Sequence, residues 1–294
     1  MNIYYLVIII LVILLINYIY NEPYEYFEDI NRKKVYIVWN DTINKQGLGD
    51  KLRGTVAIYQ YCRLNNIECI FDATFSEFGK YLKNSKQSNT NLNINTPIAS
   101  ILNVYDDDQA IKKLIDNELK DKNEAYVFCN LFPQVPLSSE DLYFLNYITE
   151  PIDELKDKVD NLLSTLNNFT IQHFRFKDGS DPNYKKCKKC YKLLKKKYNK
   201  TDILMSNSTV FKDYVLDRKK IKVIKCDDYN GCDGCEQLHV GNNSSSQVVE
   251  FTLIEYYILC KSKSIHTYSE YDWISAFVYW PAQFYNIEIT NTQL

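Results

Sequence analysis

The stretch TIQHFRFKDG, residues 170–179, carries side chains that could bind phosphate. His173 and Arg175 are two residues apart in an apolar run that is typical of a buried strand. Alternate residues of a strand point to the same face, so both side chains should face the same ligand. Together they could neutralise a pyrophosphate without a metal, with arginine contributing its bidentate fork. The alternative is that Arg175 pairs with a nearby carboxylate and that His173 fills a gap in the core.

The stretch NKQGLGDKLRG, residues 44–54, is a second candidate for anion binding. It holds three of the chain's eight glycines, and Lys51 and Arg53 fall in the first turn of the helix that follows. A strand that leads into a glycine turn and an apolar-periodic helix is how α/β proteins present backbone N–H groups to an anion. The spacing is not GxGxxG, so it predicts a phosphate or sugar-phosphate loop without implying NAD. The alternative is that the glycines only permit a tight connection.

Apolar runs and helical periods predict the elements that position these residues. The first half should contain strands at 35–39, 67–71 and 125–132 and helices at 52–64, 110–120 and 150–166. The second half should contain strands at 169–176, 202–206, 220–224 and 264–268, with helices at 185–200, 209–217, 248–260 and from about 272. We therefore predict an α/β protein of two Rossmann-like domains, residues 33–166 and 167–294, with a ligand cleft at the carboxyl ends of their strands.

Residues 1–20 are strongly apolar, with no charge between Ile3 and Ile16 and tyrosines on both sides. The run lacks the basic start and the small-residue cleavage site of a secretory signal. We therefore predict an uncleaved transmembrane anchor, followed by a polar stem at 21–32, in a single-pass membrane protein. Six glycosylation sequons would suit a lumenal catalytic part, although several arise by composition in an asparagine-rich chain: Asn40, Asn168, Asn199, Asn207, Asn242 and Asn243.

The formal net charge of −2 over 294 residues argues against nucleic acid as the main partner, but it allows a small anionic ligand. The lysine-rich segment 185–200 could contact anionic lipid or nucleic acid, and the alternative is a solvated helix face. Asp106 to Asp108 could suggest the metal-binding carboxylates of a GT-A glycosyltransferase. Acidic residues before a helix are, however, ordinary capping.

Nine cysteines are more than a reduced cytosolic enzyme needs, and four of them form two CxxC pairs. Cys187 and Cys190 make the first pair, and Cys232 and Cys235 make the second. These four could hold a structural zinc ion or, in a lumenal compartment, form disulfides with Cys226 as a further partner. Unpaired thiols are the third alternative.

Four segments resemble motifs of the fucosyltransferase superfamily, which includes protein O-fucosyltransferases, α1,6-fucosyltransferases and the nodulation fucosyltransferase. HFRFKD is similar to the motif H-x-R-x-K/G-D, and GLGDKLRG is similar to the N-terminal glycine loop. ILMSNSTVFKDYV resembles the later strand-turn-helix segment of the donor domain, and LCKSKSIHTYSEYDWISAF resembles the C-terminal block. The segments occur in the family's order and span most of residues 35–287.

The resemblance implies a two-domain GT-B fold, GDP-fucose as donor, and inversion at the anomeric carbon without an essential metal. Arg175 would then stabilise the departing β-phosphate, and His173 would support the nucleotide sugar. Gly47 and Gly49 would offer backbone near the pyrophosphate or fucose. Four serines would line the phosphate and guanine side, namely Ser206, Ser208, Ser269 and Ser275.

Two departures from the family pattern affect the expected site. Many members carry a second arginine where this chain has Phe176, and Lys177 could replace the lost phosphate contact. Asp50 stands where some members have asparagine. Asp50 or Asp178 is the candidate base for the acceptor hydroxyl, and Arg53 is a further cation for the donor.

We therefore predict a membrane-anchored, fucosyltransferase-like enzyme that requires no cofactor and transfers sugar from GDP-fucose to a glycan or protein acceptor. One alternative is an inert protein of the same fold that binds a nucleotide sugar or glycan, which the departure at Phe176 makes reasonable. Another alternative is a structural or interaction protein that is stapled by its cysteines.

Overall fold

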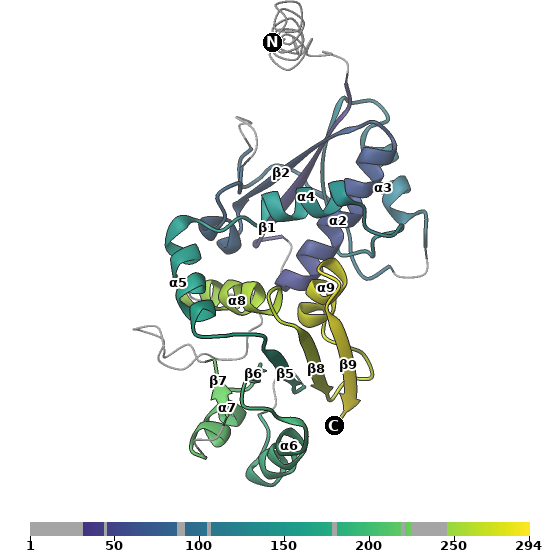
Figure 1. The fold of residues 1–294 in the computed structure, drawn as a ribbon. Helices are drawn as coiled ribbons and strands as arrows, with labels where there is room; N and C mark the ends of the chain where they lie inside the picture. The colour runs from purple at the N-terminus through teal and green to yellow at the C-terminus, as the bar shows by residue number, and fades with distance from the viewer. Residues whose placement is uncertain are drawn as a thin grey trace, which may run out of the picture. The chain divides into compact units, whose positions relative to one another are not determined.

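The computed structural model describes residues 32–43, 46–86, 92–104, 107–177, 181–218, 221–224 and 246–294. Residues 33–294 form one compact unit, which contains two parallel β-sheets with helices around them (Figure 1). The predicted anchor at 1–20 and nearly all of the predicted stem lie outside the described residues. Within the described ranges, no helix has the length and the apolar content that crossing a membrane requires.

The first sheet has the strand order β2-β1-β4-β3, and all of its strand pairs are parallel. Strand β1 (Lys34–Asn40) is an inner strand, and its residues 35–40 are all buried, as expected for a parallel sheet that is covered on both faces. The other strands are β2 (Glu68–Phe75), β3 (Ala99–Ile101) and β4 (Glu124–Cys129). The helices of this half are α2 (Leu48–Leu64), the 3₁₀ helix η1 (Glu77–Tyr81), α3 (Ala110–Glu118), α4 (Ser139–Ile148) and α5 (Asp153–Ser164).

The second sheet has the order β7-β6-β5-β8-β9, again with parallel pairs only. The chain places β6 (Ile203–Ser206) and β7 (Lys222–Val223) on one side of β5 (Thr170–Arg175). It then places β8 (Ser264–Ser269) and β9 (Glu288–Gln293) on the other side. The strand order therefore reverses at β5, and ligands of open α/β sheets bind at the carboxyl ends of the strands beside such a switch point.

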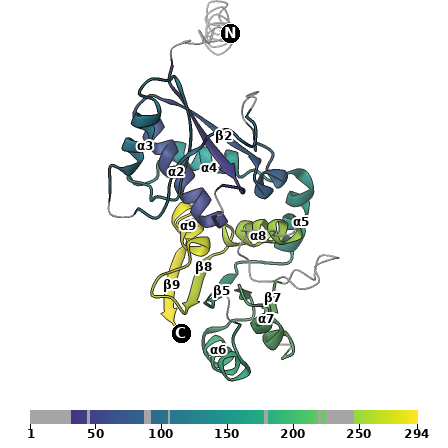
Figure 2. The ribbon, with the colours of Figure 1, turned by 180° about the vertical axis from the view of Figure 1, so that it is seen from behind.

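The helices of the second half are α6 (Tyr184–Lys197), α7 (Thr209–Leu216), α8 (Ser246–Leu259) and α9 (Ala276–Phe284). Figures 1 and 2 show α8 and α9 between the two sheets, whereas α6 and α7 lie on the side away from the first sheet. Helix α8 packs against α5 and η1, and α9 packs against α2. One buried apolar cluster therefore continues from the first half into the second.

Most predicted elements are present, and the differences have local causes. Helix α2 begins at Leu48, four residues before the predicted start, because the turn ends at Gly47. Helix α4 was not predicted, although Ser138 and Asp141 form a capping box at its start. Strand β9 has mostly exposed polar residues, so it lacks the apolar alternation that identifies a strand. In the sequence, the strands of the first sheet all precede residue 166 and those of the second all follow residue 167. Both sheets nevertheless belong to one compact unit. The division into two domains therefore stays a prediction.

The first CxxC pair lies on α6 and faces an apolar core. The thiols of Cys187 and Cys190 are buried in a cluster with Phe174 and Phe176, and both are free. Burial raises the pKa of Cys190 to about 11, so this thiol is protonated at neutral pH. Cys226, Cys232 and Cys235 lie outside the described residues, and a zinc ion or disulfide between the two pairs stays a prediction.

Two of the six sequons are parts of the folded interior. Asn40 is 1 % exposed and Asn207 is 7 % exposed. The Asn207 side chain accepts from the Phe176 backbone N–H at 2.8 Å and donates to the Phe176 carbonyl at 3.0 Å. A glycan on either asparagine would displace these buried contacts. These two sequons therefore lend no support to a lumenal location.

Candidate active site

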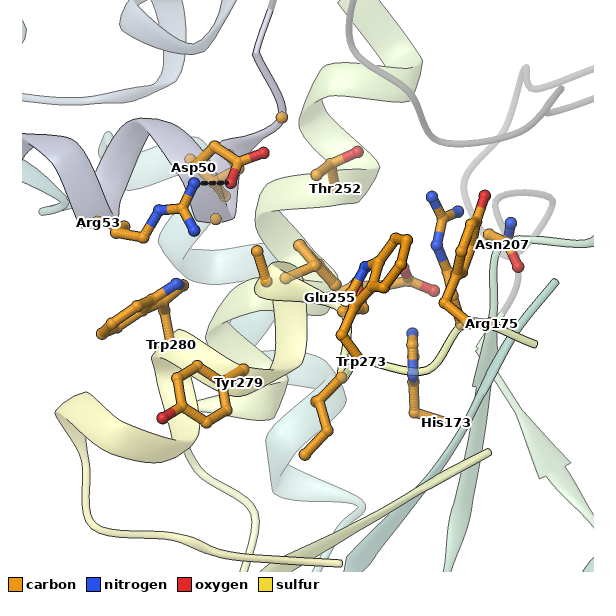
Figure 3. Close-up of a pocket in the computed structure, with 18 of the residues that line it drawn as sticks. Asp50, Arg53, His173, Arg175, Asn207, Thr252, Glu255, Trp273, Tyr279 and Trp280 are labelled. Atoms are coloured by element: carbon orange, nitrogen blue, oxygen red, sulfur yellow. Dashed lines mark ion pairs between the residues drawn. The ribbon is translucent and has the colours of Figure 1, made fainter. Parts of the chain in front are cut away.

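A cavity of about 760 Å³ lies at the switch point of the second sheet and reaches the start of α2 (Figure 3). This volume is in the range that holds a small-molecule ligand. The lining comes from the start of α2, from β5, from the end of β6, from α8, from α9 with the segment that leads into it, and from one residue after β4. The residues are Gly47, Leu48, Gly49, Asp50, Arg53, Phe132, His173, Arg175, Ser206, Asn207, Thr252, Glu255, Tyr271, Trp273, Ile274, Ser275, Ala276, Phe277, Tyr279 and Trp280.

Successive side chains of strand β5 point to opposite faces of the sheet. His173 and Arg175 both line the cavity, as the sequence predicts. Phe174 and Phe176 belong to the apolar core on the other face, where both pack against Phe211. An arginine in place of Phe176 would therefore enter this core instead of the cavity. The departure at Phe176 removes no side chain from the site that the chain builds.

His173 is 4 % exposed, and its Nδ1 lies 3.1 Å from the Thr267 hydroxyl oxygen. Burial, with the nearby cations Arg175 and Lys212, lowers the pKa of His173 to about 3. The imidazole is therefore neutral at physiological pH and can offer a hydrogen bond to a ligand, but no charge. The expected neutralisation of a pyrophosphate thus depends on Arg175. Its guanidinium carbon lies 5.7 Å from the centre of the Tyr271 ring.

The start of α2 forms the opposite wall of the cavity. Gly47 precedes the helix, and a Cβ atom added there would meet nothing within 4 Å, so the backbone is open to a ligand. The first N–H groups of a helix have no partner within it, and they attract anions. Gly49 has a packing role as well, because a Cβ there would lie 2.6 Å from the backbone of Ala276 in α9. Gly54 faces β4, where a Cβ would lie 1.7 Å from the Cys129 carbonyl oxygen.

The two cations predicted on α2 have different environments. Arg53 lines the cavity, contacts Asp50 at 2.7 Å, and lies 4.6 Å above the Phe132 ring. Lys51 is fully buried outside the cavity lining and contacts Asp41 at 3.0 Å. The expectation that Lys51 meets a phosphate is therefore wrong, because residues three or four apart share a helix face whereas neighbours two apart do not.

A buried carboxylate, Glu255 of α8, lines the cavity and was not predicted from the sequence. It is 2 % exposed, and its Oε1 accepts from Lys212 Nζ at 2.9 Å. Burial raises the pKa of Glu255, and the attraction of Lys212 opposes this rise. A signal was available, because α8 is apolar almost all round and an acid inside such a helix needs a buried partner. Two of the chain's three tryptophans, Trp273 and Trp280, also line the cavity.

Solved structures that share this fold include fucosyltransferases. The NodZ α-1,6-fucosyltransferase soaked with GDP-fucose matches with a TM-score of 0.53 and 12% identity, over 86% of this chain and 92% of that one. The same enzyme co-crystallized with GDP matches with a TM-score of 0.52 and 13% identity, over 88% of this chain and 93% of that one. Selenomethionine NodZ from Bradyrhizobium matches with a TM-score of 0.52 and 12% identity, over 85% of this chain and 91% of that one. The chain has the fold of NodZ fucosyltransferases. This confirms the predicted resemblance at the level of the fold; no protein-family model and no curated protein matches the chain.

Within this fucosyltransferase fold, the predicted donor residues divide into two groups. Ser206 and Ser275 line the cavity, whereas Ser208 and Ser269 are buried beside it and shape the backbone. The Ser208 hydroxyl accepts from the Phe211 N–H at the start of α7, and Ser269 accepts from the Tyr271 N–H. Lys177 is exposed outside the lining, and its backbone N–H donates to Glu270 at 2.8 Å. Asp178 lies outside the described residues.

The acidic run before α3 has local partners and lies outside the cavity lining. Asp107 accepts from the Gln109 backbone N–H at 2.9 Å and from Lys113 Nζ at 2.8 Å. This supports the capping alternative for Asp107, while Asp106 lies outside the described residues. In the ranges that the structure describes, no cluster of three or more His, Cys, Asp or Glu residues is placed to hold a metal ion.

Proposed function

We propose that this protein is a glycosyltransferase that transfers fucose from GDP-fucose, with inversion and without a metal. The observation that carries this proposal is the convergence of Arg175, neutral His173 and the open start of α2 on one cavity. The fold is shared with NodZ crystals soaked with GDP-fucose and with NodZ co-crystallized with GDP. A diphosphate between Arg175 and the first turn of α2 would meet positive charge on both sides.

Arg175 would act on the leaving group. Breaking the bond between fucose and phosphate builds negative charge on the β-phosphate, and a fixed guanidinium stabilises this charge more in the transition state than in the ground state. The clamp of Asn207 on the Phe176 backbone holds the end of β5, from which Arg175 projects. Because this cation and the α2 start supply the positive charge, the proposed reaction needs no metal.

Glu255 would select the base. Guanine has two adjacent donors, N1–H and the N2 amino group, and a carboxylate accepts from both. Lys212 contacts Oε1 of Glu255, and Oε2 together with the second lone pair of Oε1 would accept from the two guanine donors. Uracil and adenine lack this pair of donors, so the buried carboxylate would be left unmatched by UDP or ADP, at a cost in affinity.

Asp50 would activate the acceptor. It lines the cavity on the α2 side, whereas Arg175 and His173 project from the other side (Figure 3). Inversion requires the acceptor hydroxyl to attack from the face opposite to the leaving phosphate, so the bound fucose would have to present that face to Asp50. Arg53 holds the Asp50 carboxylate at 2.7 Å and so orients it. Asp50 would take the hydroxyl proton as the new glycosidic bond forms.

The test uses the full chain in detergent micelles. Calorimetry with GDP, UDP and ADP should show GDP binding at least about tenfold more tightly than either competitor, which corresponds to about 1.4 kcal/mol. GDP-fucose should be consumed equally with and without EDTA. Preference for UDP, or activity that EDTA abolishes, would contradict the proposal. GDP binding without any hydrolysis or transfer would support the inert binding protein instead.

The membrane anchor is a second part of the proposal, and it depends on residues 1–20 alone. The uncharged apolar run and the missing cleavage site support it. Protein from expressing cells should retain Met1 and should stay with membranes in carbonate. A chain that begins near residue 21 and is released by carbonate would show that the segment is a cleaved signal.

A further inference from the structure

Helix α6 concentrates positive charge on one side of the molecule. Residues 184–200 contain nine of the chain's 35 Lys and Arg residues and no Asp or Glu, although the whole chain has a net charge of −2. Cys187, Cys190 and Leu194 are buried on one side of α6. The lysine face, meaning the exposed lysines of α6 between Lys185 and Lys197, lies on the opposite side. The rest of the chain therefore has a net negative charge, and the positive charge is concentrated in residues 184–200.

The lysine face differs from other lysine-bearing surfaces of the protein. On α3 and α5, several exposed lysines have acidic partners on the same helix, such as Lys112 with Asp116 and Lys156 with Asp160. Among the described residues, Lys186 is the one lysine of α6 in an ion pair, with Glu270. Like charges three and four residues apart destabilise a helix, and lysines in its first turn oppose its dipole. An anionic partner would neutralise these lysines and so offset the cost of placing them together.

We propose that the lysine face of α6 binds the anionic headgroups of a membrane surface. Lysine is a strongly hydrated point charge without the fork that arginine offers to a single phosphate, so a row of lysines suits a diffuse layer of charge. Tyr184 at the start of α6 is 67% exposed, and tyrosine is favoured at the boundary between water and lipid. The apolar residues 3–16 support the choice of a membrane over other polyanions, since they would bring the chain to lipid.

This surface is separate from the proposed donor site. No residue of α6 lines the cavity, so changes to the lysine face should leave nucleotide binding intact. Anionic lipids are enriched in the cytoplasmic leaflet, so docking of α6 would place the catalytic part on the cytoplasmic side. The burial of Asn40 and Asn207 removes two of the sequons that favoured the lumen.

The test compares the full chain in vesicles of phosphatidylcholine with vesicles that contain about 30 % phosphatidylserine. The N-terminal segment is present in both, so only the charge of the surface differs. Hydrogen exchange of the backbone amides at 184–200 should be at least about fivefold slower in the anionic vesicles. The difference should disappear in about 1 M NaCl, where the screening length falls to about 3 Å.

Two variants with equal charge loss complete the test. K188Q/K192Q/K195Q/K196Q should abolish the slower exchange in anionic vesicles, while its exchange in neutral vesicles reports whether α6 stays folded. The control K112Q/K113Q/K120Q/K122Q changes four exposed lysines around α3 and should behave as the unchanged chain. Equal exchange in both vesicles, or an unchanged effect in the α6 variant, would overturn the proposal. So would a DNA duplex that slows exchange at 184–200 when anionic vesicles do not.

Discussion

Two ion pairs that contain a buried lysine, one in each half of the molecule, have almost the same geometry and different surroundings. Lys51 Nζ lies 3.0 Å from Asp41, and Lys212 Nζ lies 2.9 Å from Glu255. Both lysines also lie near aromatic rings, with Lys51 5.4 Å from the Phe128 ring centre and Lys212 4.9 Å from that of Phe251. The distances and the burial of the two lysines alone would therefore assign the two pairs the same role, although the Asp41 side chain is 26% exposed and that of Glu255 is 2% exposed.

The difference lies in what else the two carboxylates contact. Asp41 also accepts from the Ser76 hydroxyl at 3.0 Å and from the Glu77 backbone N–H at 2.7 Å, so it joins β1, α2 and the start of η1. Glu255 lines the cavity beside His173 and Arg175. A buried ion pair thus indicates a ligand site only where one partner also faces a cavity. Otherwise, as at Asp41, it connects elements of the fold.

The largest expected effect breaks the structural pair. Lys51→Met leaves Asp41 without its cation, and because the Asp41 side chain is 26% exposed the loss of unfolding free energy should be about 2–3 kcal/mol, below the ~3–5 kcal/mol of a fully buried pair. Urea unfolding of the full chain in micelles would measure this loss. Lys80→Met is the control, because the exposed pair of Lys80 with Glu77 should contribute less than about 1 kcal/mol. GDP affinity of folded Lys51→Met should be unchanged, and a large loss of GDP binding would place this pair in the site.

The second effect separates the two pairs by function. Glu255→Gln keeps the shape of the side chain but removes its charge, so GDP affinity should fall by about 10–100-fold, the scale for hydrogen bonds to a charged group of about 1.5–3 kcal/mol. Calorimetry with GDP and UDP on the same sample should show a smaller ratio of GDP affinity to UDP affinity than in the unchanged chain. Unchanged GDP affinity in Glu255→Gln would mean that the two pairs do not differ in role.

A third effect concerns His173, which is buried like the two lysines and faces the cavity like Glu255. Its pKa is about 3 in the folded protein and 6.5 as a free side chain, so the unfolded chain binds the additional proton as pH falls below 6.5. The stability contributed by neutral His173 is complete above pH 6.5 and is lost on acidification. Between pH 7 and pH 5 the loss should be roughly 2 kcal/mol. His173→Gln should lose less stability over this range, and equal losses would contradict the burial of a neutral imidazole.

The smallest effect is expected at Lys177, an exposed cation near the site that does not line it. Lys177→Ala should change GDP affinity by less than about twofold and stability by less than about 0.5 kcal/mol. Titration with GDP would measure the affinity, and thermal unfolding would measure the stability. A tenfold loss of affinity would show that Lys177 replaces the arginine that many fucosyltransferases of this superfamily carry at the position of Phe176.

The sequence predicts the strands of this fold best where burial is complete. The inner strands β1 and β5 are continuous apolar runs, and the alternation of β5 correctly assigns His173 and Arg175 to one face. The polar edge strand β9 carries no such pattern, so it is recognised only through its pairing with β8. Local patterns therefore identify inner strands and miss edges, which depend on contacts far apart in the sequence.

The same limit applies to the site. Arg175 and the glycine turn are local signals, whereas Glu255 becomes a site residue only because α8 packs between the two halves. Ser208 and Ser269 match the family pattern, yet their hydroxyls are used in caps and turns. A motif thus predicts which residues lie near a ligand, while the three-dimensional contacts decide which of them can reach it.

The most direct test of the account is the rate of fucose transfer or GDP-fucose hydrolysis by Arg175→Ala beside the unchanged chain. The unchanged chain should consume GDP-fucose, and Arg175→Ala should lose about 3 kcal/mol of transition-state stabilisation, or about 100-fold or more in kcat/KM. Arg175→Lys should recover only part of this loss, because a point charge cannot reproduce the guanidinium fork. Urea unfolding should give both variants a stability close to that of the unchanged chain. Full turnover by folded Arg175→Ala would contradict the assignment of this cavity as the fucosyl-transfer site.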